Sequence, residues 1–280
     1  MARRQTRSRT PSKKAAAATA QKKTTSKKKG NEKKYLLEDI SELYTDPTFI
    51  FFFFCALVPA IKDGDIMKFV KFATSPILIF CYVLTYCVWT WAHNGKTVKL
   101  TKEQRRACYW YLLNGIVFHF LMDFAVGTLK LEDTLGINYF KMDKRYGCVE
   151  KFMQSPGEDC PHESGYIFIL TWLEVLDSIA CFFLFRAYVQ DLPSRAPLEL
   201  ALAVSHAFGT IIFMGSEWFD GMENTPRYYP VSKGLLKAGD EGFDDQIAFY
   251  WFAFLGCNPV WIAVPFMYGM KAFNEIVAKM

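Results

Sequence analysis

His119 and Asp123 lie four residues apart within the apolar stretch of residues 116–126. This spacing predicts that both side chains lie on one face of a helix. The segment around them is long and apolar enough to cross a bilayer. Ionisable groups at that depth are costly and usually face a protein-lined cavity, so the pair indicates a functional site. A purely structural helix contact, with the acid fixing one imidazole tautomer, is the alternative.

A second acidic pair, Glu174 and Asp177, lies three residues apart on one predicted face of another apolar segment, with Ser178 beside it. Burying several carboxylates for packing alone is unfavourable. One imidazole with two or three carboxyl groups suits the delivery and removal of protons. An ionised carboxylate in an apolar pocket suits the binding of a cationic amphiphile equally well.

A third segment places Asn258 and Trp261 three residues apart, between Pro259 and Pro265, which can kink the helix and free carbonyl groups near a cavity. An indole face stabilises a cation within about 6 Å. Packing or an interfacial belt is the ordinary role of one membrane Trp. Beside buried acids, Trp261 is a partner for a transient positive charge.

Other polar residues of the apolar segments indicate less. We interpret His206 as a satisfied core histidine, and we expect Glu217 and Asp220 at a solvated mouth or helix end, where their helix leaves the membrane. The sequence shows no serine-triad signature, no GxGxxG, no phosphate loop and no metal-spaced His/Cys group.

Composition places the chain in the membrane class, because 51% of its residues are hydrophobic and 17% aromatic. Barrel strands would alternate apolar and polar residues, and that alternation is missing. We predict an all-α polytopic membrane bundle of about five transmembrane helices, with a short apolar N-terminal segment at residues 48–61. The five predicted spans are residues 72–93, 107–127, 166–189, 198–219 and 247–271.

The predicted domains are a disordered basic tail (1–34), an amphipathic or interfacial segment (35–69), the transmembrane bundle (70–272) and a C-terminal tail (273–280). The first 34 residues hold 13 Lys and Arg and one acid. Such a tail can bind anionic lipid, act as a targeting address or contact nucleic acid. No nucleic acid is expected for the membrane body. The positive-inside rule favours a cytosolic loop at residues 94–106, but five spans would then place the basic tail on the opposite side. Either residues 48–61 also cross, or the tail is cleaved, or one rule fails, and the orientation is left open.

Cys148 and Cys160 flank a loop that contains Pro156 and Gly157, and they can form a disulfide if that loop is lumenal. The other cysteines carry little functional signal.

A series of short motifs resembles the emopamil-binding protein family, the 3β-hydroxysteroid Δ8,Δ7-isomerases of the wider EXPERA group. The motifs, in the order of the family, are Arg105-Arg106, His119-x-x-x-Asp123, Leu173–Ala180 around Glu174, Gly209 with Glu217-x-x-Asp220-Gly221, and Phe254–Pro265 with Asn258 and Trp261 in register. The likeness covers about residues 70–272.

The resemblance implies a multi-pass sterol isomerase of the endoplasmic reticulum membrane. It implies protonation of a C8=C9 double bond at C9, a carbocation at C8 and loss of a proton from C7. His119, Asp123 and Glu174 would transfer the protons, with acid and base roles left open, and Trp261 would stabilise the cation. Asn258 and Asp177 would orient this set or the sterol. No cofactor or metal is expected, because protons leave and return without net redox change.

Two departures keep a second class open. The family has Glu where this chain has Asp123, and the loop before residue 166 lacks the Lys-Glu-Tyr…Lys-Gly-Asp-Ser-Arg-Tyr run of the isomerases. The alternative is a non-catalytic EXPERA-type protein that binds sterols or cationic amphiphiles at the same carboxylates. A proton-coupled transporter is a third reading, weakened by the absence of an evident inverted repeat. The partners considered are a sterol, the bilayer, cationic amphiphilic inhibitors and a second copy of the chain.

Overall fold

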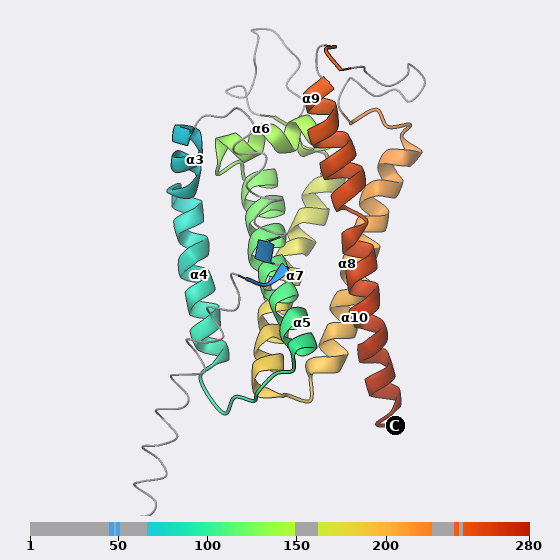
Figure 1. The fold of residues 1–280 in the computed structure, drawn as a ribbon. Coiled ribbons are helices and arrows are strands. Elements are labelled where there is room, and N and C mark those ends of the chain that lie inside the picture. The colour runs from blue at the N-terminus through green and yellow to red at the C-terminus, as the bar shows by residue number, and fades with distance from the viewer. Residues whose placement is uncertain (1–44, 48, 51–65, 149–161, 226–237, 241–242) are drawn as a thin grey trace, which may run out of the picture. The chain divides into compact units, whose positions relative to one another are not determined.

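The computed structural model describes residues 45–47, 49–50, 66–148, 162–225, 238–240 and 243–280. Residues Asp46–Met280 form one compact unit. Its described residues form helices and no strands, as the sequence predicts (Figure 1). In chain order these are α3 (Ile66–Ala73), α4 (Pro76–Ala92), α5 (Lys102–Leu113), η1 (Asn114–Thr128), α6 (Asp133–Met142), η2 (Lys144–Tyr146), α7 (Gly165–Gln190), α8 (Arg195–Phe219), α9 (Phe243–Asp245), η5 (Gln246–Cys257) and α10 (Val260–Val277).

Four helical segments of the described chain are long and apolar enough to cross a membrane. They are Lys102–Thr128, Gly165–Gln190, Arg195–Phe219 and Phe243–Val277, and they match four of the five predicted spans. The helical membrane fold is therefore confirmed. The remaining predicted span forms α4, whose 17 residues cover about 25 Å, less than the roughly 30 Å of a hydrocarbon core.

The first predicted span is interrupted near its start, because α3 ends at Ala73 and α4 begins at Pro76. Ser75 between them is extended (φ −63°, ψ 148°), and its hydroxyl accepts from the Leu78 N–H as the N-cap of α4. A proline has no N–H to donate and disfavours a helical residue before it, so the helix restarts here.

The N-terminal predictions fall largely outside the described residues. These are the tail 1–34, most of segment 35–69, and the apolar segment 48–61, of which only residues 49–50 are described. At the other end, α10 continues past the predicted boundary at residue 272 to Val277. Cys148 is disulfide-bonded, and Cys160 lies outside the described residues.

Local signals in the sequence start and end the spans. Thr101 and Gln104 form a reciprocal capping box that begins α5, and the Ser164 hydroxyl caps α7. Asp191 adopts a left-handed conformation (φ 53°) that ends α7 and turns the chain toward α8.

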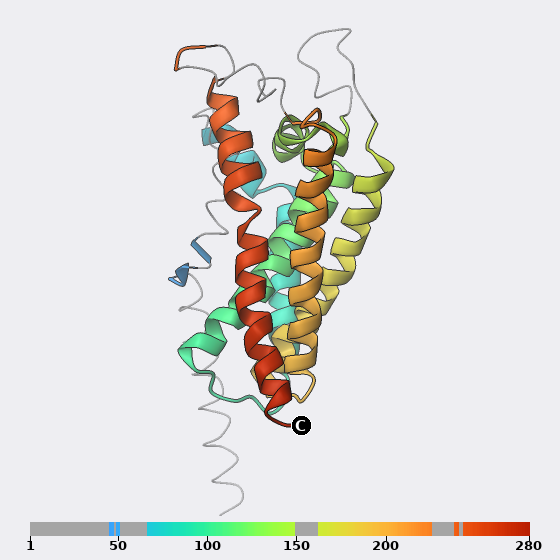
Figure 2. The same cartoon turned by 90° about the vertical axis from the view of Figure 1, so that its right-hand side faces the viewer.

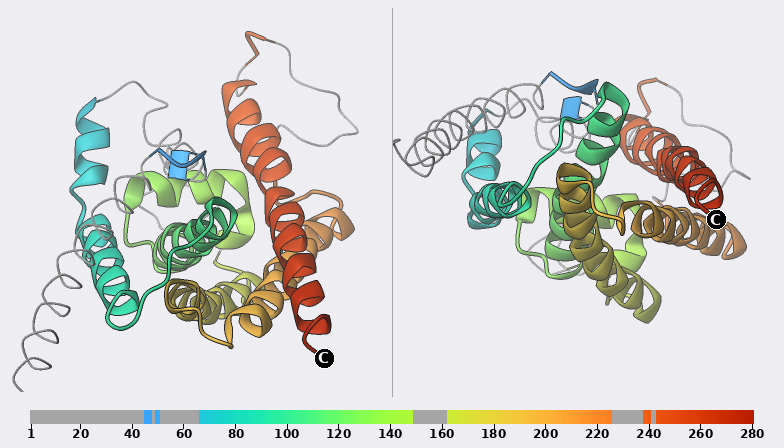
Figure 3. Two further views of the ribbon diagram at one scale, coloured as in Figure 1. Left: turned by 60° about the horizontal axis from the view of Figure 1, so that its bottom comes forward. Right: turned by 90° about the horizontal axis from the view of Figure 1, so that it is seen from below.

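Two pairs of helices pack along their length: η1 with α7, and α8 with α10 (Figure 2). Each pair approaches closely at a glycine. A Cβ on Gly115 would lie 2.8 Å from Cys181 Cβ, and one on Gly269 would lie 2.7 Å from Ala203 Cβ. Side chains larger than hydrogen do not fit there, so these glycines set the spacing within each pair. Seen from below, α8 and α10 lie side by side (Figure 3).

The short helix α6 runs across one end of the bundle, roughly perpendicular to the spans (Figure 1). The loop after it is fixed by Arg145, whose Nη2 lies 2.6 Å from Asp143 Oδ2 and whose Nε lies 3.4 Å from Glu217 Oε2. Both carboxylates are fully buried. This ion cluster attaches the loop to the end of α8.

Glu217 therefore corrects one expectation from the sequence. It lies in the last turn of α8, as expected, but it is buried rather than solvated. Arg145 neutralises its charge, and the backbone N–H groups of Asn224 and Thr225 donate to it at 2.8 and 3.0 Å. Asp220 is exposed, as expected.

Candidate functional site

A cavity between η1, α6, α7, α8, η5 and the start of α10 brings most of the predicted site residues together. His119, Asp123, Glu174, Asn258 and Trp261 all line it. The rest of its wall is largely apolar or aromatic, and includes Phe118, Met122, Leu135, Met142, Leu170, Phe213, Phe249 and Phe252. No Lys or Arg occurs among the described residues of the wall, so no permanently charged cation there offsets the carboxylates.

The π-helical backbone of η1 explains which of its polar residues share one face of the helix. In a π-helix the hydrogen bonds join residues five apart, so positions i, i+4 and i+5 come close to one face. Asn114 and His119 are five apart, and His119 and Asp123 are four apart. The backbone therefore aligns three polar side chains within an apolar span.

His119 contacts α7 through Glu174, since its Nδ1 faces Glu174 Oε2 as an ion pair or charged hydrogen bond. The imidazole is only 3% exposed, and the Glu174 side chain is 18% exposed. Glu174 thus reaches both the imidazole and the cavity, which is the position a proton carrier between them requires.

Asp123 is held from the other side by α6. The Tyr139 hydroxyl donates to Asp123 Oδ1 at 2.8 Å, and the Tyr139 ring packs edge-on against Tyr146 at 4.8 Å between centroids. Burial and the neighbouring Asp123 raise the pKa of Tyr139 above its ordinary value, so its hydroxyl remains a donor at neutral pH.

Trp261 uses its ring and its N–H for different contacts. Its Nε1 donates to Asn114 Oδ1 at 2.6 Å, and its ring packs edge-on against Phe118 at 4.4 Å. The predicted role for this indole, stabilisation of a cation, requires a fixed ring at the wall. The bond to Asn114 fixes it.

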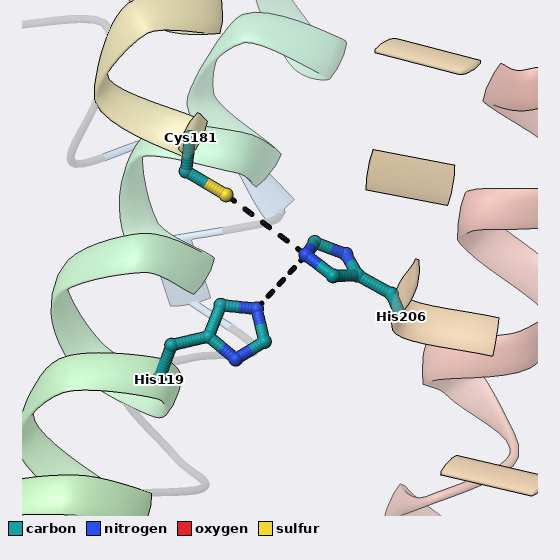
Figure 4. Close-up of side chains that lie close together, drawn as sticks. All are labelled: His119, Cys181 and His206. Carbon is teal, nitrogen blue, oxygen red and sulfur yellow. Dashed lines mark hydrogen bonds between the residues drawn. The ribbon is translucent and has the colours of Figure 1, made fainter. Parts of the chain in front are cut away.

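Asn114 and His206 are site residues that the sequence did not identify. Asn114 Nδ2 lies 2.8 Å from His119 Nε2 and 3.3 Å from His206 Nδ1. His206 Nε2 lies 3.0 Å from His119 Nε2, and the two rings face each other from η1 and α8 (Figure 4). His206 is buried and hydrogen-bonded, as expected of a core histidine, but it also lines the cavity.

Two groups of donor atoms lie close enough to hold a metal ion, although the sequence shows no metal-ligand spacing. They are His119 with Cys181 and His206 (Figure 4), and His119 with Asp123 and Glu174, each within 4.8 Å. In the first group His119 Nε2 already contacts the Asn114 amide nitrogen, and Cys181 Sγ lies 4.0 Å from His206 Nε2. An ion there would have to displace the amide.

Asp177 and Asn258 are predicted to orient the proton-transfer set or the sterol, but the hydrogen bonds of their side chains go to other groups. Asp177 is absent from the cavity wall and accepts two contacts from the Ser205 hydroxyl, at 2.7 and 3.0 Å. Asn258 lines the cavity, but its Nδ2 donates to the carbonyls of Phe254 and Ala253, at 2.8 and 3.3 Å. These carbonyls precede Pro259, which has no N–H to donate to this turn.

The fold and the cavity define the class of this molecule: a polytopic helical membrane protein with ionisable side chains in the wall of a largely apolar cavity. Residues 150–272 match the family model EXPERA (EXPanded EBP superfamily), in agreement with the resemblance that the motifs show. The match includes Glu174, His206 and Trp261, whereas His119 and Asp123 precede it. A comparison with curated proteins finds no match.

Proposed function

We propose that the chain is a membrane sterol isomerase that moves a ring double bond from Δ8 to Δ7. The observation that carries the proposal is the convergence of His119, Asp123 and Glu174, from two helices, on one cavity with apolar walls. An EXPERA domain is consistent with a sterol as the guest. The cavity chemistry suits proton addition and removal on a flat apolar molecule.

In the proposed reaction the three groups add one proton at C9 and remove one from C7, and the double bond moves without change of oxidation state. Trp261 presents an aromatic ring to the positive charge at C8. Apolar walls keep water from trapping that cation. Asp177, which lies outside the wall, is left out of this set.

The test is incubation of the purified protein with zymosterol, or another Δ8-sterol, in deuterated water. The expected product is the Δ7-sterol carrying one deuterium at C9. His119→Ala and Glu174→Gln should abolish turnover, while Glu103→Gln on the exposed start of α5 should retain it. A folded wild-type protein that binds the sterol but gives no Δ7 product would refute the isomerase.

The alternative is a non-catalytic protein that binds sterols or cationic amphiphiles. Two observations favour it: the wall carries two carboxyl groups and no Lys or Arg among its described residues, and residue 123 is Asp where isomerases have Glu. In the binder, Glu174→Gln lowers affinity for a cationic amphiphile and there is no turnover to lose. In both proposals the protein resides in the endoplasmic reticulum membrane, and neither requires a cofactor.

A further inference from the structure

We propose that Asn114 and His206 are positioning residues that hold His119 as the neutral tautomer with its proton on Nδ1. The inference starts from the indole of Trp261, because an indole N–H can only donate. Its partner at 2.6 Å must therefore be the oxygen of the Asn114 amide. This contact determines the orientation of the Asn114 side-chain amide, whose oxygen and nitrogen atoms are otherwise hard to tell apart.

With the oxygen committed to Trp261, the NH₂ group of Asn114 faces both histidines. It lies 2.8 Å from His119 Nε2 and 3.3 Å from His206 Nδ1, and an NH₂ group has two hydrogens to donate. Both ring nitrogens must then accept, so neither carries a proton. Each ring, if neutral, carries its proton on the other nitrogen.

The remaining contacts agree with that assignment. His206 then carries its proton on Nε2, which lies 3.0 Å from the unprotonated Nε2 of His119 (Figure 4). His119 carries its proton on Nδ1, which faces Glu174 Oε2. An imidazolium at His119 would instead direct an Nε2–H at the amide hydrogens of Asn114. The three partners thus select one protonation pattern.

The consequence for catalysis rests on the proposed function. The lone pair of His119 Nε2 is occupied by Asn114 and His206, and Nδ1 already carries a proton toward Glu174, so the neutral imidazole takes up no further proton and stabilises the Glu174 carboxylate as a donor. Glu174, which lines the cavity, is then the group of the pair that exchanges the proton with the sterol. An imidazole in the wrong tautomer can cost several powers of ten in rate in other enzymes.

The test is a nitrogen-15 NMR spectrum of the full-length protein labelled at histidine, because imidazole nitrogen shifts distinguish the tautomers. The chain has four histidines. His93 is an internal reference: its Nδ1 lies 2.8 Å from the Trp89 carbonyl, which can only accept, so this nitrogen carries a proton. His93→Asn and His162→Asn identify the signals of these two residues.

The expected spectrum shows His119 protonated on Nδ1 alone and His206 protonated on Nε2 alone. Protonation of His119 on Nε2, or on both nitrogens, at neutral pH would overturn the proposal. This readout does not depend on turnover, so it stands or falls separately from the isomerase.

Two variants test what holds the tautomer. Asn114→Asp keeps the acceptor for Trp261 but removes the NH₂ donor, so His119 should gain a proton on Nε2. Trp261→Phe keeps an aromatic ring but frees the amide to turn, and should give a mixture of tautomers, with His93 unchanged in both.

In the isomerase assay, Asn114→Asp should lower kcat tenfold or more with little change in KM, since Asn114 is absent from the cavity wall. An unchanged His119 signal in both folded variants would contradict the positioning role.

Discussion

The Tyr139 hydroxyl donates to Asp123 across 2.8 Å and joins helix α6 to the helix that carries His119. Asp123 is one methylene shorter than the Glu of the isomerase pattern, and the tyrosine meets it from the end of the bundle. The short helix α6 is therefore part of the site rather than a simple connection between spans.

Tyr139→Phe should lower kcat/KM for a Δ8-sterol roughly tenfold, which corresponds to about 1.4 kcal/mol. The reason is that Asp123 loses a donor that fixes its carboxyl group. Tyr82→Phe, on the exposed face of α4, is the matched control and should leave the rate unchanged. Equal rates for both variants would show that this hydrogen bond does not matter to the reaction.

Gly209→Leu should weaken sterol binding roughly tenfold or more, because a large side chain would enter the cavity beside Glu174. Gly209→Ala should bind nearly as the wild type, since its Cβ would lie 3.7 Å from Glu174 Oε1, an ordinary contact. Gly215→Leu on the same helix is the control, because its Cβ meets nothing within 4 Å. Equilibrium binding of a labelled sterol measures the difference, and full binding by Gly209→Leu would place the guest elsewhere.

Arg145→Met should lower the unfolding free energy by about 3–5 kcal/mol, because it leaves Asp143 and Glu217 buried without their cation. Thermal unfolding in detergent measures this loss. Lys144→Met, at the neighbouring half-buried position, should have a small effect. A melting temperature for Arg145→Met equal to that of Lys144→Met would contradict the structural role of the ion cluster.

Lys130 predicts a pH dependence of stability. Burial lowers its pKa from 10.5 to about 8, against the opposing effect of Glu163. Between pH 8 and 10.5 the unfolded chain therefore binds a proton that the folded protein has released, so the unfolding free energy rises with pH in that window. After allowance for solvent screening, the gain is on the order of 1 kcal/mol.

The measurement for Lys130 is the melting temperature at pH 8 and at pH 10, compared between the wild type and Lys130→Met. The wild type should gain stability over this window relative to the variant. Identical pH profiles would show that Lys130 is not desolvated in the folded protein.

The sequence predicts the spans and the cavity-lining acids for the same reason. A membrane requires long apolar helices, and a charge inside one is too costly to be incidental. This argument found His119, Asp123, Glu174 and Trp261, which the structure brings together at one cavity. Their proposed roles in proton transfer remain predictions.

Other site residues depend on features that the sequence does not display. Asn114 and His119 are five apart, a spacing that faces different sides of an α-helix and comes together only in a π-helix. Tyr139 belongs to a connecting helix whose position across the bundle depends on tertiary packing. Glu217 looked like a solvated helix end because its partner, Arg145, is more than seventy positions away in the chain.

The disulfide at Cys148 stands two residues from Tyr146, which lines the cavity. Such bonds form where oxidants reach the chain, outside the reducing cytosol. We expect the α6 end of the molecule to face an oxidising compartment, with the lysine-rich turn after α4 at the opposite end of the bundle (Figure 1). Protein made under reducing conditions is therefore expected to form its helices but to lack this covalent bond near the cavity.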